Sequence, residues 1–495
     1  MSKECPFYAA IDLGSNSFHM LIVRELSGSI QTIAKVKRKV RLAAGLGADD
    51  SLDQAAMVRG WQCLSLFAEQ LRDIPDEQIK IVATATLRRA TNAAEFLAQA
   101  EKILHHKIRI ISGETEAKII YRGVAHTSSG SGKRLVIDIG GASTELVIGE
   151  QSEALLLNSL DLGCVTWLKR FFQEQLSQAN FDAAIAAAQQ VINPVISDYR
   201  RLGWQSSVGA SGTIQALSEV ITAQGMDERI TYQKLKTIQQ QVIACGHLEH
   251  LNIVGLEEER KPVFASGLAI LIALFESLQI KSLTLAGGAL REGLVYSLLS
   301  QEETSSVRTR TADSFVKRHR IDRPHAQRVA NCALAMAKQL SPSLSNRALS
   351  LLKWAAMFHE VGLNIEFKRA PQHAAYIIDH SDLPGFTSAQ KHLVSNLLLN
   401  QRGEWQAQLL EQQHALPLNE AQVLARLLRI AIIVCMRRTE DSVPKITLLQ
   451  TDLDWRLCFP PTWNEQHPLR AAELELEAEV QRQAGYPLEI IEALC

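Results

Sequence analysis

The chain has 495 residues, of which 46% are hydrophobic and 21% are charged. This is the composition of folded globular proteins; it excludes extensive disorder, collagen-like repeats and a long coiled coil, and the length predicts several domains. The 52 basic and 53 acidic side chains give a net charge of −1. Because no overall field attracts DNA or an anionic membrane, we expect neither as a partner, and any anion site must be local.

The cysteines and the apolar segments predict a cytoplasmic protein. The eight cysteines are scattered, without CxxC pairs or zinc-finger spacing, which indicates reduced thiols. The longest apolar stretch, residues 263–275, is shorter than the ~20 residues of a membrane span and predicts a buried helix. The first six residues contain no apolar secretory core.

Apolar runs and glycine turns alternate at the start of the chain. Residues 7–11, 18–23 and 30–36 predict three strands in an antiparallel meander. Helical spacing follows at 53–71, and two further strands are predicted at 81–83 and 108–111. Strands that alternate with helices indicate an α/β layer structure.

The opening motif occurs a second time. Residues 137–140 (Ile-Asp-Ile-Gly) repeat residues 11–14 (Ile-Asp-Leu-Gly) at an offset of 126, since 137 − 11 = 126. Ser143 matches Ser17 at the same offset, and both copies stand between apolar runs. The repeat predicts two related lobes that face one cleft.

Beyond about residue 300, glycine becomes rare and helical periodicity dominates. Residues 348–356 and 424–431 carry apolar stripes at helical spacing, whereas 446–449 and 455–459 predict two strands. We expect a helical third domain and a small α+β C-terminal region after a polar linker at 301–305. The expected domains are residues 1–128, 129–303, 304–440 and 441–495.

Four glycine turns follow predicted strands, at residues 14–17, 140–143, 209–213 and 287–289. Such turns expose backbone N–H groups that can hold phosphate oxygens, although any one of them could be a simple tight hairpin. The duplicated Asp-x-Gly favours a phosphate cleft. A Walker A loop is excluded, because residues 130–134 lack the required upstream glycine and the following Ser/Thr. A dinucleotide-binding fold is disfavoured, because no GxGxxG follows a strand.

Acidic residues accompany these turns. Asp12 and Asp138 end their strands, and Glu145 lies on the strand after the second turn; all three are candidates for Mg²⁺ binding. The alternative is that each carboxylate accepts hydrogen bonds from its own turn. Glu114 and Glu116 begin a helix, where the macrodipole alone favours acids; either could instead orient and deprotonate an attacking water.

Basic residues cluster at 35–41, 84–89 and 308–323. Each cluster could be a solvated surface, but three of them in a neutral protein suggest a polyanionic substrate. In the helical region, His325 and His359-Glu360 resemble part of a metal phosphohydrolase motif of the HD type. Because Glu360 stands where that motif has Asp, and no convincing Asp follows downstream, we expect these side chains to be satisfied core or surface residues.

Residues 10–19, 111–117, 136–145 and 209–213 together resemble the exopolyphosphatase / guanosine pentaphosphate phosphatase family. The resemblance covers essentially the whole chain, and residues 37–46, 83–88 and 285–296 look most like the guanosine pentaphosphate branch. It implies an α/β fold: two actin/Hsp70/sugar-kinase-like lobes (a duplicated ribonuclease H-like fold), then a degenerate HD-like helical domain and the small α+β region.

The resemblance also implies roles for individual residues. Glu116 matches the family's catalytic base, and Asp138, Glu145 and Asp12 match presumed Mg²⁺ positions. Ala142 replaces a glycine found in the polyphosphatase branch but keeps its amide. The residues that match phosphate-binding positions are Gly14, Ser15, Asn16, Ser17, Arg88, Gly140, Gly141, Ala142, Ser143, Gly209, Ser211 and Gly212.

The implied reaction is hydrolysis of the terminal 5′ phosphate of guanosine pentaphosphate in the stringent response, with Mg²⁺ as cofactor. An exopolyphosphatase that releases phosphate from inorganic polyphosphate is the nearest alternative. A sugar or acetate kinase and a non-catalytic alarmone sensor are further alternatives. A homodimer is expected from the resemblance alone.

Overall fold

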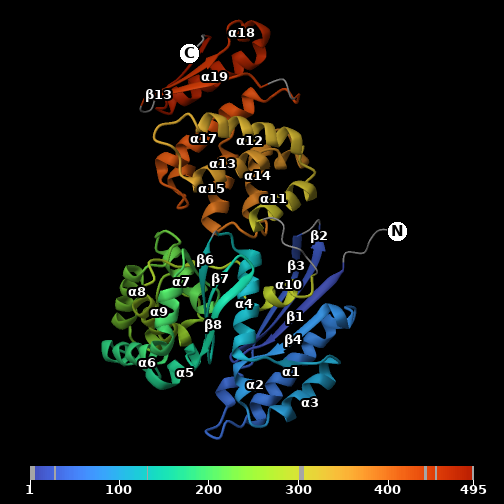
Figure 1. Ribbon diagram of the computed structural model, residues 1–495, viewed down its shortest axis with the longest axis vertical. Helices are drawn as coiled ribbons and strands as arrows, with labels where there is room; N and C mark the ends of the chain where they lie inside the picture. Colours follow the sequence, from blue (N-terminus) through green and yellow to red (C-terminus); the bar gives the residue numbers. More distant parts are fainter. Residues whose placement is uncertain are drawn as a thin grey trace. The chain divides into compact units, whose positions relative to one another are not determined.

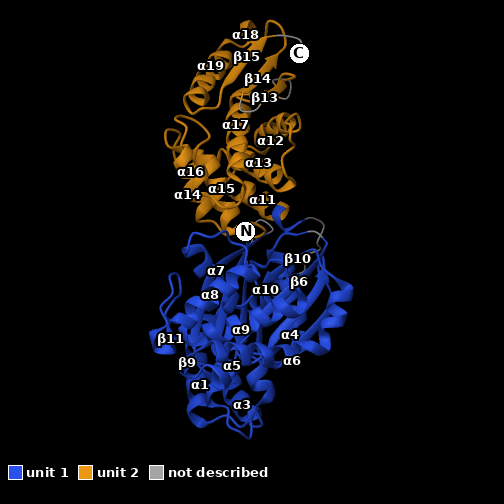
Figure 2. Ribbon diagram, turned by 90° about the vertical axis from the view of Figure 1, so that its left-hand side faces the viewer, with its two compact units in different colours: residues 1–308 blue, residues 309–495 orange. Residues whose placement is uncertain are grey.

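The computed structural model describes residues 6–26, 29–130, 132–299, 306–439, 443–451 and 454–492. The predicted linker at 301–305 lies outside these residues. The chain forms two compact units, Met1–Arg308 and Thr309–Cys495 (Figure 2). Unit 1 contains two α/β lobes, and unit 2 is mostly helical (Figure 1).

The first lobe is built on a five-stranded sheet in the order β3-β2-β1-β4-β5. Its first three strands are antiparallel and confirm the predicted meander, whereas β4 and β5 run parallel to β1. The strands are β1 (Phe7–Leu13), β2 (Ser17–Leu26), β3 (Ser29–Lys39), β4 (Ile79–Ala83) and β5 (Arg109–Ile110). The helices of this segment are η1 (Leu42–Gly45), α1 (Gln54–Leu71), η2 (Asp76–Gln78), α2 (Ala85–Arg89), α3 (Ala93–Leu104) and α4 (Gly113–Thr127).

The second lobe repeats this topology. Its main sheet has the order β8-β7-β6-β10-β12, again with three antiparallel strands followed by two parallel ones. The irregularity between Ile22 and Val23 recurs between Ile148 and Gly149, at the same offset of 126, since 148 − 22 = 126. The strands of this sheet are β6 (Lys133–Ile139), β7 (Thr144–Glu150), β8 (Glu153–Leu160), β10 (Ser206–Gly209) and β12 (Thr284–Leu285). The predicted duplication is therefore confirmed down to the position of a bulge.

The helices of the second lobe surround an apolar core. The buried helix predicted at 263–275 is part of α9 (Lys261–Leu278), whose side chains are almost all inside the lobe. Among the described helices, α9 is the one long and apolar enough to fit a membrane span, and 78% of that window is buried in the protein. The other elements are α5 (Cys164–Phe171), β9 (Gln175–Leu176), α6 (Gln178–Leu202), α7 (Gly212–Ala223), α8 (Tyr232–Ala244), β11 (Gly246–His247), η3 (Leu248–His250) and α10 (Leu290–Tyr296).

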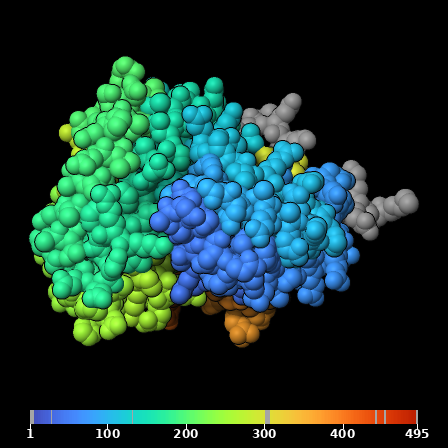
Figure 3. Space-filling view, turned by 90° about the horizontal axis from the view of Figure 1, so that it is seen from below, coloured from blue at the N-terminus to red at the C-terminus, as the bar shows by residue number. Residues whose placement is uncertain are grey.

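Two helices join the lobes. The helix α4 packs on α10 and on strands β7 and β8, while α10 packs on β1 and β2 (Figure 1). The helices cross where glycines permit close backbone contact: a Cβ on Gly123 would lie 2.0 Å from Ala289 O, and one on Gly293 would lie 1.9 Å from Ile119 O. Residues of both sheets and both helices share one apolar cluster, so the lobes form a single unit. On the face shown in Figure 3, the blue atoms of the first lobe meet the green atoms of the second.

Unit 2 combines a helical region with a small sheet. Strands β13 and β14 are antiparallel, β15 runs parallel to β14, and both predicted strands are confirmed. Apolar residues from the helices and from this sheet belong to one core. The elements that begin after the glycine-rich lobes are α11 (Val307–Arg318), α12 (Arg323–Ala337), α13 (Asn346–Phe358), η4 (Val361–Asn364), α14 (Ala370–Asp379), α15 (Ser388–Leu399), α16 (Ala407–Glu411), α17 (Leu418–Val434), β13 (Thr447–Thr451), β14 (Asp454–Phe459), α18 (Trp463–Gln466), α19 (Pro468–Gln483) and β15 (Leu488–Glu492).

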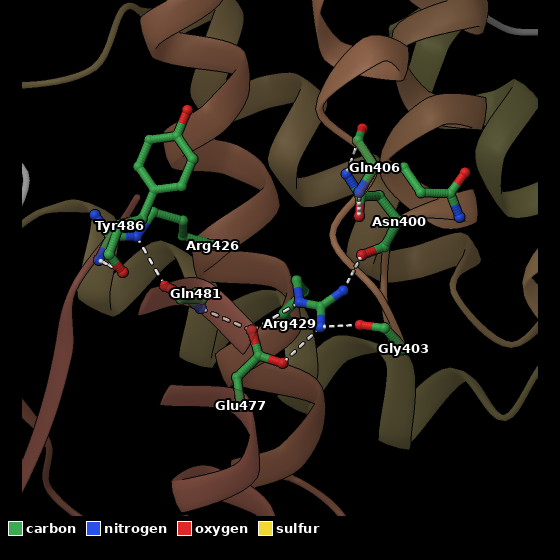
Figure 4. Close-up of polar contacts among 8 residues, drawn as sticks. All are labelled: Asn400, Gly403, Gln406, Arg426, Arg429, Glu477, Gln481 and Tyr486. Atoms are coloured by element: carbon green, nitrogen blue, oxygen red, sulfur yellow. Dashed lines mark hydrogen bonds and ion pairs between the residues drawn. The ribbon is translucent and has the colours of Figure 1, made fainter. Parts of the chain in front are cut away.

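Buried arginines connect α17 to α19 (Figure 4). Arg429 forms a double ion pair with Glu477, with both N–O distances at 2.7 Å, and donates to the carbonyls of Asn400 and Gly403. Arg426 donates to Gln481 at 2.8 Å, and its guanidinium lies 3.7 Å from the centre of the Trp455 ring. Because a buried charge is costly when it lacks partners, this network ties the C-terminal helix to the helical region.

The cysteines correct one expectation. Cys63, Cys164, Cys245, Cys332 and Cys435 are free thiols, as predicted. Cys458 is disulfide-bonded, so the expectation that all thiols are reduced was wrong for this residue. Scattered cysteines show no pairing signal in the sequence, because a disulfide depends on proximity in the fold.

Candidate functional site

A cavity in unit 1 is lined by the ends of the central strands of both lobes. It gathers glycine turns, four carboxylates and several cationic side chains. The predicted site residues that line it are Asp12, Gly14, Ser15, Asn16, Ser17, Glu116, Asp138, Gly140, Gly141, Ala142, Ser143, Glu145, Ser211 and Gly212. Because these residues come from segments far apart in the sequence, the fold brings the predicted motifs into one place.

The two copies of the repeated turn face each other across the cavity. A Cβ on Gly14 would lie 2.9 Å from Ser17 O, and one on Gly140 would lie 3.0 Å from Ser143 O, so both turns need glycine for the same reason. A Cβ on Gly141 would lie 3.1 Å from Ser15 Cβ and 3.8 Å from Asn16 N. This close approach allows backbone N–H groups from both lobes to contact one bound anion.

The other two glycine turns differ in their roles. Ser211 caps α7, its Oγ accepting a hydrogen bond from Ile214 N at 3.4 Å, and Gly212 and Thr213 present the helix N-terminus to the cavity. Such a terminus favours phosphate. The fourth turn packs instead: a Cβ on Gly287 would lie 2.7 Å from Thr127 O. Only Ala289 of residues 287–289 lines the cavity.

Four carboxyl groups share the cavity, and burial dominates their ionisation. Burial raises the pKa of Asp12 to about 6, against the lowering effect of Arg291. Burial, with the Glu145 and Asp12 carboxylates, raises the pKa of Asp138 to about 8. Burial also raises the pKa of Glu145 to about 7, although hydrogen bonds from Ser159 and Ser143 lower it. Burial therefore favours the neutral forms of these acids unless a cation stabilises the charged forms.

A divalent cation fits this carboxylate group. Asp12 Oδ1 is buried and has no hydrogen-bond partner among the described residues. Strand register places Asp138 directly opposite Glu145 on the neighbouring strand. Carboxylate oxygens are the ligands that Mg²⁺ takes from proteins, and a 2+ charge would favour the ionised forms of all three acids. Asp12, Asp138 and Glu145 are thus suited to hold Mg²⁺.

Glu116 lies in the first turn of α4, where the helix is capped by Ser112. The Ser112 Oγ accepts a hydrogen bond from Thr115 N at 3.1 Å. Glu116 is 7% exposed, and its Oε2 lies 3.3 Å from Arg88 Nη1. Burial, with Glu145 and Asp12, raises the pKa of Glu116 well above its usual range, while Arg88 lowers it. This carboxylate can accept a proton inside the cavity.

The structure separates the two acids that the sequence left open. Glu114 is exposed and does not line the cavity, whereas Glu116 is buried and does. The helix turns by about 100° per residue, so two acids separated by two positions face different directions. Arg88 and Gly209 are the two predicted site residues absent from the lining. Arg88 holds Glu116 and donates to Ile111 O at 2.7 Å, so its place is beside the cavity.

Several cationic or polar side chains of the cavity were not among the predicted site residues. Arg260 and Arg291 line it, and Lys37, which lay within a predicted basic cluster, also reaches it. Arg260 lies against the third turn: a Cβ on Gly212 would lie 2.2 Å from its Nη2. His19 completes the group; burial, with Arg291, Lys37 and Arg260, lowers its pKa to about 3. The duplication offered a signal, because 19 + 126 = 145 pairs His19 with Glu145.

Two lobes of equal strand order, with facing glycine turns at the base of a charged cavity, define an actin-like fold that handles phosphate groups. The family model described as the Ppx/GppA phosphatase family matches residues 21–302, and the model of its domain III matches residues 307–478. The chain belongs to the Ppx/GppA phosphatase family, a family of hydrolases.

Curated relatives match over almost the whole chain. The guanosine-5′-triphosphate,3′-diphosphate pyrophosphatase of Aeromonas hydrophila is 58% identical over 492 residues, which cover 99% of both chains. The protein of the same name from Vibrio vulnificus is 53% identical over 489 residues and 98% of both chains.

Solved structures share the fold of the lobes. The Aquifex aeolicus PPX-GPPA enzyme aligns over 59% of this chain and 99% of its own, with a TM-score of 0.51 and 24% identity. An exopolyphosphatase from Cytophaga hutchinsonii aligns over 59% of this chain and 97% of its own, with a TM-score of 0.54 and 22% identity. The predicted fold class, two actin-like lobes followed by a helical region and a small α+β region, is confirmed.

Proposed function

We propose that this protein hydrolyses the terminal 5′ phosphate of guanosine 5′-triphosphate 3′-diphosphate, giving the tetraphosphate and inorganic phosphate. The observation that carries the proposal is the cavity in which two facing phosphate turns, a buried glutamate and a group of cations meet. The relatives at 53–58% identity bear the name of this activity.

The proposed site binds the phosphate chain through both lobes. Backbone N–H groups of the turns at 14–17 and 141–143 and the N-terminus of α7 donate hydrogen bonds to phosphate oxygens; Gly140 N–H instead donates to Ser143 O within its turn. Lys37, Arg260 and Arg291 balance the negative charge of the chain. Asp12, Asp138 and Glu145 would hold Mg²⁺, which would neutralise negative charge on the phosphate groups. These donors are in place before the reaction, so they stabilise charge as it develops.

Glu116 acts as the general base in this proposal. Its carboxylate orients a water molecule and accepts a proton as the water oxygen bonds to the terminal phosphorus. The bridging P–O bond breaks, and its electron pair stays on the leaving phosphate chain. Arg88 holds the carboxylate through the 3.3 Å ion pair and is itself fixed by the carbonyl of Ile111.

The Glu116→Gln variant tests this role. We expect turnover to fall about 10²–10⁴-fold, because the amide cannot accept the proton, while substrate binding remains measurable. Phosphate release and equilibrium binding are the measurements. Glu114→Gln is the matched control: this acid lies in the same helical turn but is exposed, so turnover should stay unchanged. Turnover like that of the unmodified protein in Glu116→Gln would remove Glu116 from the mechanism.

Inorganic polyphosphate is the second candidate substrate. Lys35, Lys37 and Lys39 alternate along β3 and therefore share one face of the strand, and Lys37 reaches the cavity. Such a track suits a longer polyanion. A competition assay with both substrates discriminates the candidates: we expect guanosine pentaphosphate to be the preferred one, and preferential cleavage of polyphosphate would reverse the assignment. A cytoplasmic location stays a prediction from the cysteines and apolar segments, and a homodimer stays a prediction from the resemblance.

A further inference from the structure

A second group of metal-ligating side chains lies in unit 2, outside the proposed phosphate site. His325 is on the first turn of α12, and His359 and Glu360 follow α13. Each offers one ligand atom, and the three atoms lie within 4.8 Å of one another. His325 and His359 are 4% and 6% exposed. Two imidazoles and a carboxylate thus converge at a largely buried point.

The histidine rings are oriented for binding. His359 Nδ1 lies 2.7 Å from Ala356 O, so Nδ1 carries the proton and donates it, which leaves the lone pair of Nε2 available. A metal-bound histidine commonly donates the N–H of its other ring nitrogen to a backbone carbonyl, and this hydrogen bond fixes the ring. His325 Nε2 lies 3.7 Å from Glu360 Oε1, which is too long for a hydrogen bond. Ligands of a tetrahedral ion are separated by about 3.4 Å, so modest side-chain rotations would close the site.

A cation already occupies part of this environment. Arg438 pairs with Glu360 through a short contact and with Asp322 at 3.0 Å. Asp322 also caps α12, accepting a hydrogen bond from His325 N at 3.1 Å. The carboxylates of Asp322 and Glu360 thus create a negative environment beside the imidazoles, and this environment favours a cation. Because the Arg438 side chain is 49% exposed, its guanidinium can turn into solvent at low cost and release Glu360.

We propose that His325, His359 and Glu360 form a binding site for a divalent transition-metal ion of the zinc class, and that Arg438 competes with the ion for Glu360. Imidazole ligands suit Zn²⁺, Co²⁺, Ni²⁺ and Fe²⁺ rather than Mg²⁺. Three protein ligands leave a position open for water or an anion. The sequence favoured a structural role for these residues because Glu360 replaces Asp; a carboxylate one methylene longer still reaches the same point. This site is independent of the proposed hydrolysis.

Cobalt binding to the full-length protein tests the proposal. The protein is loaded with Co²⁺ in excess Mg²⁺, which keeps carboxylate-only sites filled, and is then desalted. We expect one equivalent of retained Co²⁺, measured by mass spectrometry of metals, with visible absorption bands typical of nitrogen ligation. His359→Gln and Glu360→Gln should lower the affinity at least about tenfold. Arg438→Gln should raise it by at least about tenfold, because a competing positive charge is gone.

The controls separate binding from folding. His392→Gln removes a half-exposed histidine of the same unit that pairs with Asp379, and it should leave Co²⁺ retention unchanged. If His359→Gln does not fold, the opposite changes in Co²⁺ affinity expected for Glu360→Gln and Arg438→Gln still test the proposal. The proposal is overturned if neither the unmodified protein nor Arg438→Gln retains Co²⁺. It is equally overturned if the Co²⁺ affinity of Glu360→Gln equals that of the unmodified protein, or if Arg438→Gln does not strengthen binding.

Discussion

The aspartates of the two repeated turns face side chains of different charge on the neighbouring strand. In the first lobe Asp12 is opposite His19, and in the second lobe Asp138 is opposite Glu145, at equivalent positions of the register. The second lobe therefore supplies a pair of acids, suited to Mg²⁺, whereas the first lobe supplies one acid beside a neutral imidazole. A fold that duplicates its backbone thus does not duplicate its chemistry.

His19 should make the protein less stable in acid. Its pKa is about 3 in the folded state and near 6.5 when the chain is unfolded, so between these values the unfolded state binds the extra proton. The free energy of unfolding contributed by His19 is fully present above pH 6.5 and is lost as the pH falls toward 3. In His19→Gln, we expect the stability difference between pH 7 and pH 5 to shrink by about 2 kcal/mol.

Urea unfolding at the two pH values measures this effect. Other titrating groups are the same in both proteins and cancel from the comparison. His250→Gln is a suitable control because His250 is exposed. The stability difference between pH 7 and pH 5 should be the same in this variant as in the unmodified protein. An unchanged difference in His19→Gln would mean that the buried imidazole is not held neutral.

At the scale of elements, the crossing of α4 and α10 positions the chemistry. Glu116 is three residues before Ile119 on α4, and Arg291 is two residues before Gly293 on α10. The crossing brings the backbones together at Ile119 and Gly293. Any change in this contact therefore displaces Glu116, the proposed general base, and a cation of the cavity together.

Gly293→Ala should impair both stability and turnover. The added Cβ would lie 1.9 Å from Ile119 O, so the helices must separate. We expect a loss of about 1–3 kcal/mol in the free energy of unfolding and a lower kcat, because Glu116 moves with α4. Gly60→Ala is the matched control: its Cβ meets the ring of Phe96, away from the cavity, so kcat should be unchanged. Unaltered kcat in Gly293→Ala would show that the crossing does not position Glu116 for turnover.

At the scale of the whole molecule, the chain divides its tasks between two units. The proposed phosphate site lies within Met1–Arg308, and the candidate metal site lies within Thr309–Cys495. Unit 2 has one apolar core, and unit 1 has three apolar clusters of its own. We therefore expect the two units to respond separately to ligands and to core substitutions.

Calorimetry of Glu477→Ala tests this independence. Removing Glu477 leaves Arg429 buried without its carboxylate partner, which should cost about 3–5 kcal/mol and lower the unfolding temperature of unit 2 by roughly 10 °C. Glu479→Ala, which removes a half-exposed acid of the same helix, is the control and should change little. Guanosine pentaphosphate at about 100 times its Kd, added in the Glu116→Gln background, should stabilise unit 1 alone by about 2.7 kcal/mol. The independence of the two units would be contradicted by a single unfolding transition whose temperature is shifted both by Glu477→Ala and by the added ligand.

Local patterns in the sequence predicted most of the elements and the two phosphate turns. An apolar run, or a run in which apolar and polar residues alternate, indicates a strand, and a following Asp-x-Gly indicates a tight turn. The meander and its repeat could therefore be recognised from the sequence alone. The apolar stretch at 263–275 likewise became a core helix because its composition leaves no polar face. Membership of the family followed from the same motifs.

Contacts between distant segments were decided only by tertiary structure. The helical pattern did not separate Glu114 from Glu116, since both stand in one helical turn, and only the family resemblance favoured Glu116. Neither selected Arg260, Arg291 or His19 for the cavity. The partial HD-type motif grouped His325 with His359 and Glu360, but only the fold shows that their ligand atoms lie within 4.8 Å of one another, although His325 and Glu360 are 35 positions apart, since 360 − 325 = 35. The physical reason is range: backbone preferences act within a few residues, whereas the direction in which a side chain points depends on how whole helices and sheets pack.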